Sequence, residues 1–387
     1  MTTFVRRCEP TYEILMERTE KTGRLASLDA LRGFDMLFIM GLSPLIVSVC
    51  NLFPGGGDSL ISLNMGHAKW DGFYHHDTIF PLFLFIAGIS FPFSYSKQIS
   101  SGASRKQIYA KIFKRAIALV FLGVVYNGLF RLDFQDLRIA SVLGRIGIAW
   151  MFAALLFINF KTRTRAVIAA AVLIGYWLLM SLVPAPDAPA GSGPFSFEGN
   201  LAGFIDRHIL PGRLHNGTFD PEGLLSTVPA IVTAMLGMFT GEFIRLPEQR
   251  ISGNRKTIYM IAAAAALIVA GLIWSTVFPI NKSLWSSSFV CVAGAYSLGL
   301  FALFYYLADV RGWKGWTLFF KVVGMNSITI YLAQAIIDFG GISDFFFGGV
   351  SGLCPAGWGA VIDNAGYMTV CWLFLYFLYR HKIFLKV

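Results

Sequence analysis

The sequence predicts an all-α membrane protein, a polytopic helix bundle of about ten transmembrane helices with both termini in the cytoplasm. Three observations predict this class. The chain of 387 residues is 56% hydrophobic and only 14% charged, whereas a soluble domain carries roughly 25% charged residues. Apolar stretches of about 20 residues, the length that a helix needs to cross the hydrocarbon, recur from residue 28 onward. Finally, Lys and Arg gather in every second link between these stretches.

The apolar stretches define the expected spans in chain order. They cover residues 28–53, 77–96, 111–131, 139–160, 165–183, 222–245, 257–277, 285–308, 317–338 and 358–379. We expect helices and not an outer-membrane barrel, because the alternating pattern of barrel strands is missing. The phenylalanine run 345–347 is too short to span and is expected to be re-entrant or interfacial.

The basic links set the expected orientation. Lysines and arginines cluster before residue 25, in links 97–115, 161–165, 245–256 and 309–316, and in the C-terminal tail. Short cytoplasmic loops are enriched in these residues, so 1–27 is expected to be a cytoplasmic segment. It has no apolar stretch or cleavage site, and we expect no cleaved signal peptide.

The remainder, 28–387, is expected to form a single transmembrane domain with two long outer loops, 54–76 and 184–221. Loops of this length are usually functional or disordered. The second loop holds five apolar residues, which favours packing over disorder: Phe195, Phe197, Leu201, Phe204 and Ile205.

Composition also excludes several classes. The net charge of +10 comes from clusters between apolar runs, which fits membrane topology and indicates no nucleic-acid partner. The five cysteines show no CxxC or His-paired spacing, so neither a disulfide framework nor a zinc site is expected.

Ionisable residues inside spans are costly and point to function by default. They are Asp29, Arg32, Asp35, Asp77, Arg145 and Asp338. Structural alternatives stay open: Arg32 could extend to the cytoplasmic surface or pair with Asp29 three residues earlier. Arg145 could form a structural ion pair, for example with Asp77, or bind substrate.

A histidine cluster precedes the second span. His67 lies in the first outer loop, and His75 and His76 come directly before Asp77. Histidine suits proton transfer near neutral pH. A metal site is the alternative, but the i, i+4 spacing of a zinc helix is absent, and we expect no metal. Asp77 could also act as a helix N-cap.

Five strings together resemble the heparan-α-glucosaminide N-acetyltransferase family and its bacterial relatives. They are SLDALRGFD at 27–35, DTIFPLFLFIAG at 77–88, DPEGLL at 220–225, NKSLW at 281–285 and GMNS at 324–327. The resemblance extends over nearly the whole chain. It implies an acyltransferase domain over 28–387, placed as a multi-pass protein in the bacterial inner (cytoplasmic) membrane. We expect no counterpart here of the lysosomal enzyme's additional N-terminal luminal region and first helix.

The resemblance implies that acetyl-CoA, the acetyl donor and only expected cofactor, binds from the cytoplasmic side, and that a glucosamine-type amine or glycan end accepts the acetyl group outside. In that family a histidine just before the second core helix is the catalytic residue, which corresponds to His67. An asparagine ahead of a glycine run is its partner, which Asn51 resembles. Amine acylation needs a base and oxyanion donors. His67 suits the first role, Asn51, Asn281 or Lys282 the second, and Asp77 would orient the imidazole.

The remaining candidate residues are expected to bind either the acetyl donor or the sugar. Cationic and amide side chains are expected to hold the polyanionic donor: Arg32, Arg115, Arg145, Lys282 and Asn326. Trp70 is expected to stack on a sugar face, with Asp220, Glu222 and Asn281 as further sugar-binding residues.

Two other functions stay open. An O-acyltransferase acting on a cell-surface glycan or a peptidoglycan sugar is the first, since the motifs specify neither the acceptor atom nor its polymer. A multi-pass transporter, from a different class, should show two related halves with matched broken helices, and the sequence shows none. Membrane lipid is an expected partner, and a homodimer is left open.

Overall fold

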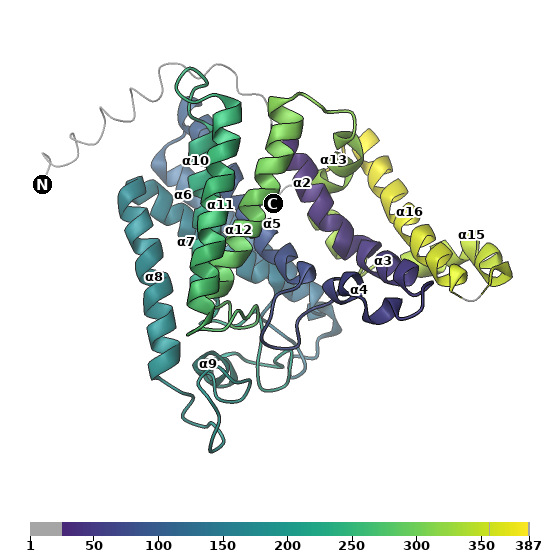
Figure 1. Ribbon diagram of the computed structural model, residues 1–387, viewed down its shortest axis with the longest axis horizontal. Helices are drawn as coiled ribbons and strands as arrows, with labels where there is room; N and C mark the ends of the chain where they lie inside the picture. The colour runs from purple at the N-terminus through teal and green to yellow at the C-terminus, as the bar shows by residue number, and fades with distance from the viewer. Residues whose placement is uncertain (1–24, 356, 386–387) are drawn as a thin grey trace, which may run out of the picture.

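A computed structural model describes residues 25–355 and 357–385, and the regular secondary structure of this part of the chain is helix (Figure 1). No strand forms among these residues, where an isolated antiparallel bridge joins Arg138 and Gly212. The all-α prediction is confirmed. Residues 1–24 of the expected cytoplasmic segment lie outside the described residues.

The helices follow one another with short links except around the two long loops. The first half contains α2 (Ala26–Leu37), η2 (Phe38–Leu42), α3 (Ser43–Cys50), η3 (Gly56–Asp58), α4 (Leu60–Asn64), η4 (His75–Thr78), α5 (Ile79–Ser100), α6 (Arg105–Tyr126), η5 (Leu129–Arg131), α7 (Val142–Asn159) and α8 (Thr162–Leu182). The second half contains α9 (Leu201–Ile209), α10 (Thr227–Ile244), α11 (Gly253–Ser275), α12 (Ser287–Tyr305), η6 (Tyr306–Val310), α13 (Thr317–Met325), α14 (Ser327–Ala333), α15 (Phe339–Leu353) and α16 (Trp358–Arg380).

Eight segments of the described chain are long and apolar enough to cross a membrane, and each matches an expected span. They are Ala26–Cys50, His75–Ser100, Val142–Asn159, Thr162–Leu182, Thr227–Ile244, Gly253–Ser275, Ser287–Val310 and Trp358–Arg380. The two other expected spans differ. Helix α6 forms, but its first half is dense in Lys and Arg. The expected span 317–338 is not one helix, because Asn326 leaves helical geometry between α13 and α14.

The links alternate between two ends of the bundle, as the charge pattern predicts. At one end, the basic links meet: Arg105 donates to Asn159 Oδ1 at 3.2 Å and Arg165 to Glu242 Oε1 at 2.7 Å. At the other end, the Gly- and Pro-rich links meet, and α9 lies among them at the lower end of Figure 1. Gly72 N there donates to Ile280 O at 2.8 Å. We call these the inner and outer ends; which one faces the cytoplasm stays a prediction.

Glycines bring α2 and α13 into backbone contact. A Cβ on Gly33 would lie 1.7 Å from the carbonyl oxygen of Phe320, and one on Gly324 would lie 2.2 Å from that of Asp29. Such close approach excludes any larger residue and favours tight packing within a membrane. Two of the strings quoted above, far apart in sequence, therefore lie side by side.

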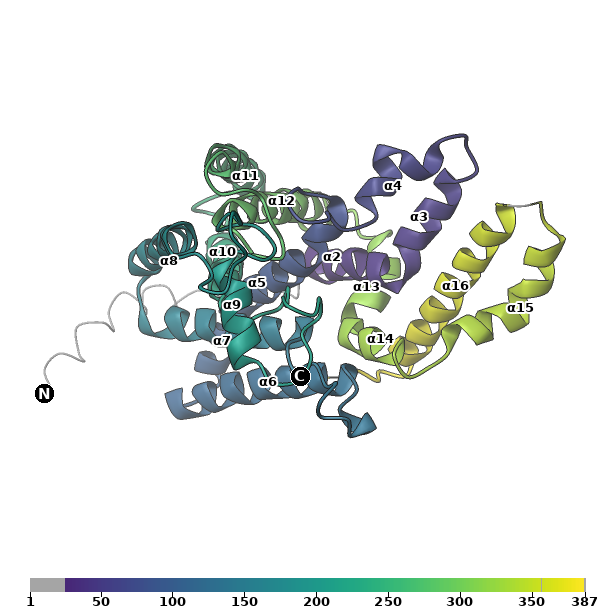
Figure 2. The same cartoon turned by 90° about the horizontal axis from the view of Figure 1, so that it is seen from below.

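The outer loop 184–221 packs against the bundle, as predicted. Phe219, Phe278 and Leu284 form a buried cluster with the C-terminal half of α8, and the loop's five apolar residues belong to it or pack on it. Helix α15 pairs with α16 at one edge of the bundle (Figure 2). At about 1.5 Å per residue, its 15 residues are too short to span.

Candidate active site

His67 and Asp77 form a pair at the outer end. Helix entry at η4 fixes the carboxylate of Asp77, whose Oδ2 accepts the backbone N–H groups of Tyr74 at 3.1 Å and Ala68 at 3.3 Å. Its Oδ1 lies 2.8 Å from His67 Nδ1. Asp77 is buried with 1% of its side chain exposed, whereas the His67 side chain is 51% exposed. The predicted N-cap role of Asp77 is wrong, because Tyr74 is the N-cap residue of η4 and Asp77, at the third helical position, accepts the Tyr74 N–H. The predicted contact of its carboxylate with the His67 imidazole is present.

This contact decides which imidazole nitrogen is free. An ionised carboxylate only accepts hydrogen bonds, so Nδ1 of His67 carries the proton that it donates to Asp77. The lone pair then lies on Nε2, which is the nitrogen able to accept a proton. A carboxylate in this position holds the imidazole orientation and stabilises its protonated form.

Lys282 reaches the same imidazole from the link between α11 and α12. Its Nζ lies 3.3 Å from His67 Nε2, 3.1 Å from Nδ1 and 3.8 Å from Asp77 Oδ1. Burial lowers the pKa of the Lys282 ammonium, against the opposing charge of Asp77. Lys282 therefore meets His67 and Asp77 from a link far away in sequence.

Asn281 holds this link in place. Its Nδ2 donates to Asp71 Oδ1 at 3.1 Å, and its Oδ1 accepts Leu284 N at 2.8 Å. The side chain is buried and both of its polar atoms are engaged. Its expected contact with a sugar stays a prediction, but the geometry favours the positioning of Lys282.

The neighbouring histidines have different partners. His75 Nδ1 lies 2.9 Å from the Tyr296 hydroxyl, and His76 Nδ1 lies 3.2 Å from Ser43 Oγ. The His76 ring also meets the His67 ring edge-on at 4.6 Å between centroids. His67 is thus the imidazole that the Asp77 carboxylate orients.

Trp70 joins the two outer loops. Its Nε1 donates to Phe195 O at 2.8 Å, and its ring packs edge-on against Phe197 and Phe219. Trp70 therefore anchors loop 54–76 to loop 184–221. Stacking on a sugar, which its partly exposed ring leaves open, stays a prediction.

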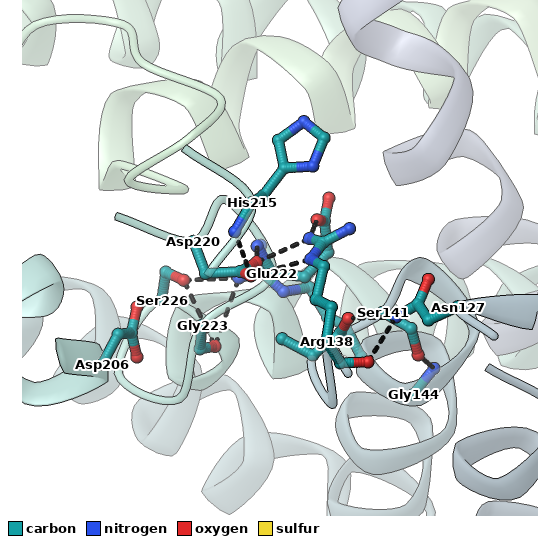
Figure 3. Close-up of polar contacts among 12 residues, drawn as sticks. Asn127, Arg138, Ser141, Gly144, Asp206, His215, Asp220, Glu222, Gly223 and Ser226 are labelled. Atoms are coloured by element: carbon teal, nitrogen blue, oxygen red, sulfur yellow. Dashed lines mark hydrogen bonds and ion pairs between the residues drawn. The ribbon is translucent and has the colours of Figure 1, made fainter. Parts of the chain in front are cut away.

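Arg138 forms a buried charge cluster with Asp220 and Glu222 (Figure 3). Its Nε and Nη2 donate to the two carboxylate oxygens of Asp220 at 2.8 Å and 2.6 Å, and Nη2 also donates to Glu222. Burial alone would lower the pKa of the Arg138 guanidinium, but the hydrogen bond to Asp220 and the charge of Glu222 raise it. Burial likewise opposes ionisation of Asp220, and Arg138 outweighs it and lowers that pKa.

Sequence reasoning missed Arg138. The available signal was the pair of carboxylates at Asp220 and Glu222, which need a cation from an outer link. Because Asp220 is fully buried and also accepts the N–H groups of His215 and Glu222, it holds loops together. Glu222 keeps the more accessible carboxylate of the two.

Arg145 lies beneath this cluster and is 2% exposed. Its Nη2 donates to Gly223 O at 3.2 Å and to Ser226 Oγ, and its guanidinium lies 5.1 Å from the Trp285 ring centroid. The alternative of an Arg145–Asp77 ion pair is wrong, because Asp77 pairs with His67 and Lys282. Nε and Nη1 of Arg145 have no hydrogen-bond partner among the described residues.

Asp206 on α9 is a second buried acid of the outer end. Its Oδ1 accepts Leu224 N at 2.8 Å, and the side chain has no solvent exposure. Burial raises the pKa of Asp206 to about 7. The segment after Asp220 is therefore held by an aspartate that titrates near neutrality.

Cationic side chains converge toward the inner end. Arg32 Nη2 donates to Ser90 Oγ at 3.4 Å, and Asp29 Oδ1 lies 3.9 Å from its Nη1, so the pairing alternative is present. The Arg115 guanidinium lies 4.3 Å from the Trp150 ring centroid and feels the charge of Arg32. The like charges of Arg32 on α2 and Arg115 on α6, both expected to bind the acetyl donor, thus repel each other.

Asn326 and Asn51 are the last two of the predicted site residues. Asn326, at the break between α13 and α14, is 2% exposed, and neither polar atom of its side chain has a partner in the described chain. Asn51 ends α3 and is exposed, with Oδ1 facing the turn at Gly57. No hydrogen bond joins Asn51 to His67 among the described residues, so their partnership stays a prediction.

The bundle and this site define a multi-pass membrane protein with an aspartate-oriented histidine open at one end. The family model described as heparan-alpha-glucosaminide N-acetyltransferase, catalytic, matches residues 24–272. The chain belongs to this family. Curated relatives named heparan-alpha-glucosaminide N-acetyltransferase are 27% identical (human) and 25% identical (mouse), over 94% and 96% of this chain. The chain spans 60% and 61% of their lengths. The matched range contains His67, Asp77 and Arg138 but ends before Lys282.

Proposed function

We propose that the protein transfers an acetyl group from acetyl-CoA, bound from the inner end, to the amine of a glucosamine-type sugar at the outer end. The observation that carries this proposal is the His67–Asp77 pair: Nδ1 of His67 lies 2.8 Å from the buried carboxylate, and the His67 side chain is 51% exposed at the outer end. The names of the human and mouse relatives support an acetyltransferase acting on glucosaminide.

The inner half offers suitable groups for the donor. The nucleotide end of CoA is polyanionic, and Arg32 and Arg115 place two cations near the inner end. The neutral arm of the donor would pass between helices, where Asn326 presents an amide with unused donors and an unused acceptor. Buried polar atoms without partners are rare and costly, which supports a polar ligand at this depth.

His67 acts as the general base in this mechanism. Its Nε2 takes a proton from the acceptor ammonium, and the resulting amine attacks the thioester carbonyl carbon. The C–N bond forms and the C–S bond breaks, the nitrogen gives its second proton to the leaving thiolate, which becomes the thiol, and the imidazolium releases its proton to solvent. Asp77 stabilises the imidazolium, and the Lys282 ammonium donates to the oxygen on which charge develops.

A direct assay tests this function. Purified protein in lipid nanodiscs is given acetyl-CoA and glucosamine, and free CoA and N-acetylglucosamine are measured together. We expect both products in equal amounts. Free CoA without acetylated sugar would contradict the proposed acceptor.

His67→Ala tests the base. We expect a loss of roughly 10²-fold or more in transfer, with acetyl-CoA binding retained, because the imidazole contacts Asp77 and Lys282 and has no contact with Arg32 or Arg115 among the described residues. The matched control is His208→Ala, an exposed histidine on α9 that contacts Phe204. Substitution of His75 or His76 should cost much less than loss of His67. Near wild-type turnover of His67→Ala would refute the assignment of His67 as the base. A radiolabelled acetyl group that stays on wild-type protein but is absent from His67→Ala would indicate an acetyl-imidazole intermediate in place of the general-base role.

A further inference from the structure

A primary amine of the protein itself lies where the acceptor amine is needed. Lys282 Nζ lies 3.1 Å from Nδ1 and 3.3 Å from Nε2 of His67, and 3.8 Å from the Asp77 carboxylate. An amino sugar presents the same chemical group, an ammonium on a carbon chain, and needs the same two neighbours: a base for its proton and a carboxylate for its charge. Lys282 thus occupies the position of the acceptor amine.

We propose that Lys282 is an acetylation site of the protein, modified on Nζ by its own acetyl donor when no sugar amine occupies the site. This inference rests on the proposed function, since it requires the thioester to arrive beside His67. In the step, the Nζ lone pair forms a bond to the carbonyl carbon and the C–S bond breaks. His67 Nε2 takes the proton from nitrogen, and the leaving thiolate takes a proton to become CoA.

Two features favour this lysine over others on the molecule. Its side chain is 20% exposed, and burial lowers its pKa, so more of it is the free amine that attacks a thioester. The link is also held rigidly: Asn281 is fixed to Asp71, and Leu284 O accepts the Tyr176 hydroxyl at 2.6 Å. Nζ therefore stays next to the base.

Acetylated Lys282 would block the active site. The acetylated side chain is an amide, which is neutral and cannot return its acetyl group to a sugar. Since the acetyl amide would fill the space beside His67, a modified molecule loses transfer activity. Bound amino sugar would displace Lys282 from Nε2 and protect it.

Peptide mass spectrometry tests the proposal with a control lysine from the same region. Purified full-length protein in nanodiscs is incubated with acetyl-CoA and no sugar, and acetyl occupancy is followed at Lys282 and at Lys69. Lys69 lies two residues from His67, is exposed and has no hydrogen bond or ion pair among the described residues. It therefore reports uncatalysed acetylation. We expect Lys282 to be acetylated at least tenfold faster than Lys69.

Two comparisons show whether the site drives the reaction. In His67→Ala, the acetylation rate of Lys282 should fall to that of Lys69. In wild-type protein, added glucosamine should slow acetylation of Lys282 at least tenfold and leave acetylation of Lys69 unchanged. The glucosamine comparison needs no variant, so it holds even if His67→Ala folds poorly. Equal rates at the two lysines, or no effect of glucosamine, would overturn the inference.

The same samples separate this inference from the proposed function. N-acetylglucosamine formed without Lys282 acetylation refutes the inference and leaves the function standing. Acetylated Lys282 without acetylated glucosamine supports the inference and refutes the proposed acceptor. If neither is acetylated, both are wrong.

Discussion

Removal of Arg138 is expected to destabilise the outer end severely. The guanidinium is 12% exposed, and its partners Asp220 and Glu222 are 0% and 9% exposed. Arg138→Ala leaves two buried carboxylates without their cation, and breaking a buried pair in this way costs about 3–5 kcal/mol. At about 2 °C per kcal/mol, the unfolding midpoint should fall by roughly 6–10 °C at pH 7.

The pH dependence of this loss identifies its cause. In wild-type protein the lowered pKa of Asp220 means that its stabilising effect is present above about pH 4 and is lost as pH falls below that value. In Arg138→Ala, burial dominates and raises the pKa of Asp220, so the variant is most stable in acid and weakens as pH rises. The difference between the two proteins should therefore shrink from pH 7 to pH 5.

The assay is tryptophan fluorescence during heating in detergent at both pH values. Arg207→Ala is the matched control, because Arg207 makes the same two-point contact with Asp187 at 3.1 Å and 2.6 Å on the same end, but with Asp187 38% exposed. Exposed pairs contribute little. Equal losses in the two variants, or an Arg138→Ala loss that does not change with pH, would refute this reasoning.

Three further outcomes are expected. Because the pKa of Asp206 is raised to about 7, its contribution to stability is complete below about pH 4 and is lost as pH rises through 7; Asp206→Asn should flatten this slope in the same heating assay. Gly33→Ala should destabilise the protein by about 1–3 kcal/mol, since the new Cβ would meet the backbone of Phe320, while Gly175→Ala on α8 meets nothing within 4 Å and should be tolerated. Ser192→Cys, in a cysteine-free background, should react with an impermeant thiol reagent added outside intact cells; labelling from the cytoplasmic side alone would reverse the predicted orientation.

Hydropathy and charge were sufficient to predict the fold class. A stretch of about 20 apolar residues has few alternatives to a membrane-spanning helix, so eight spans could be located from sequence alone. Helix α6 and the α13–α14 break were harder to predict. Five Lys and Arg side chains occupy the first half of α6. The break at Asn326 directly follows the helix that packs against α2, and no local pattern reports that contact.

The site divides in the same way. The sequence by itself predicted that His67 and Asp77 lie close together, because they are ten residues apart in one loop and the Asp is at a helix start. Only the tertiary structure decided that Lys282, 215 residues later, lies against the same imidazole, that Arg138 neutralises Asp220, and that Asn281 holds a link together. The physical reason is that each of these contacts joins different outer links. Their distances depend on how the helices pack, while the sequence specifies only that the links emerge at the same end.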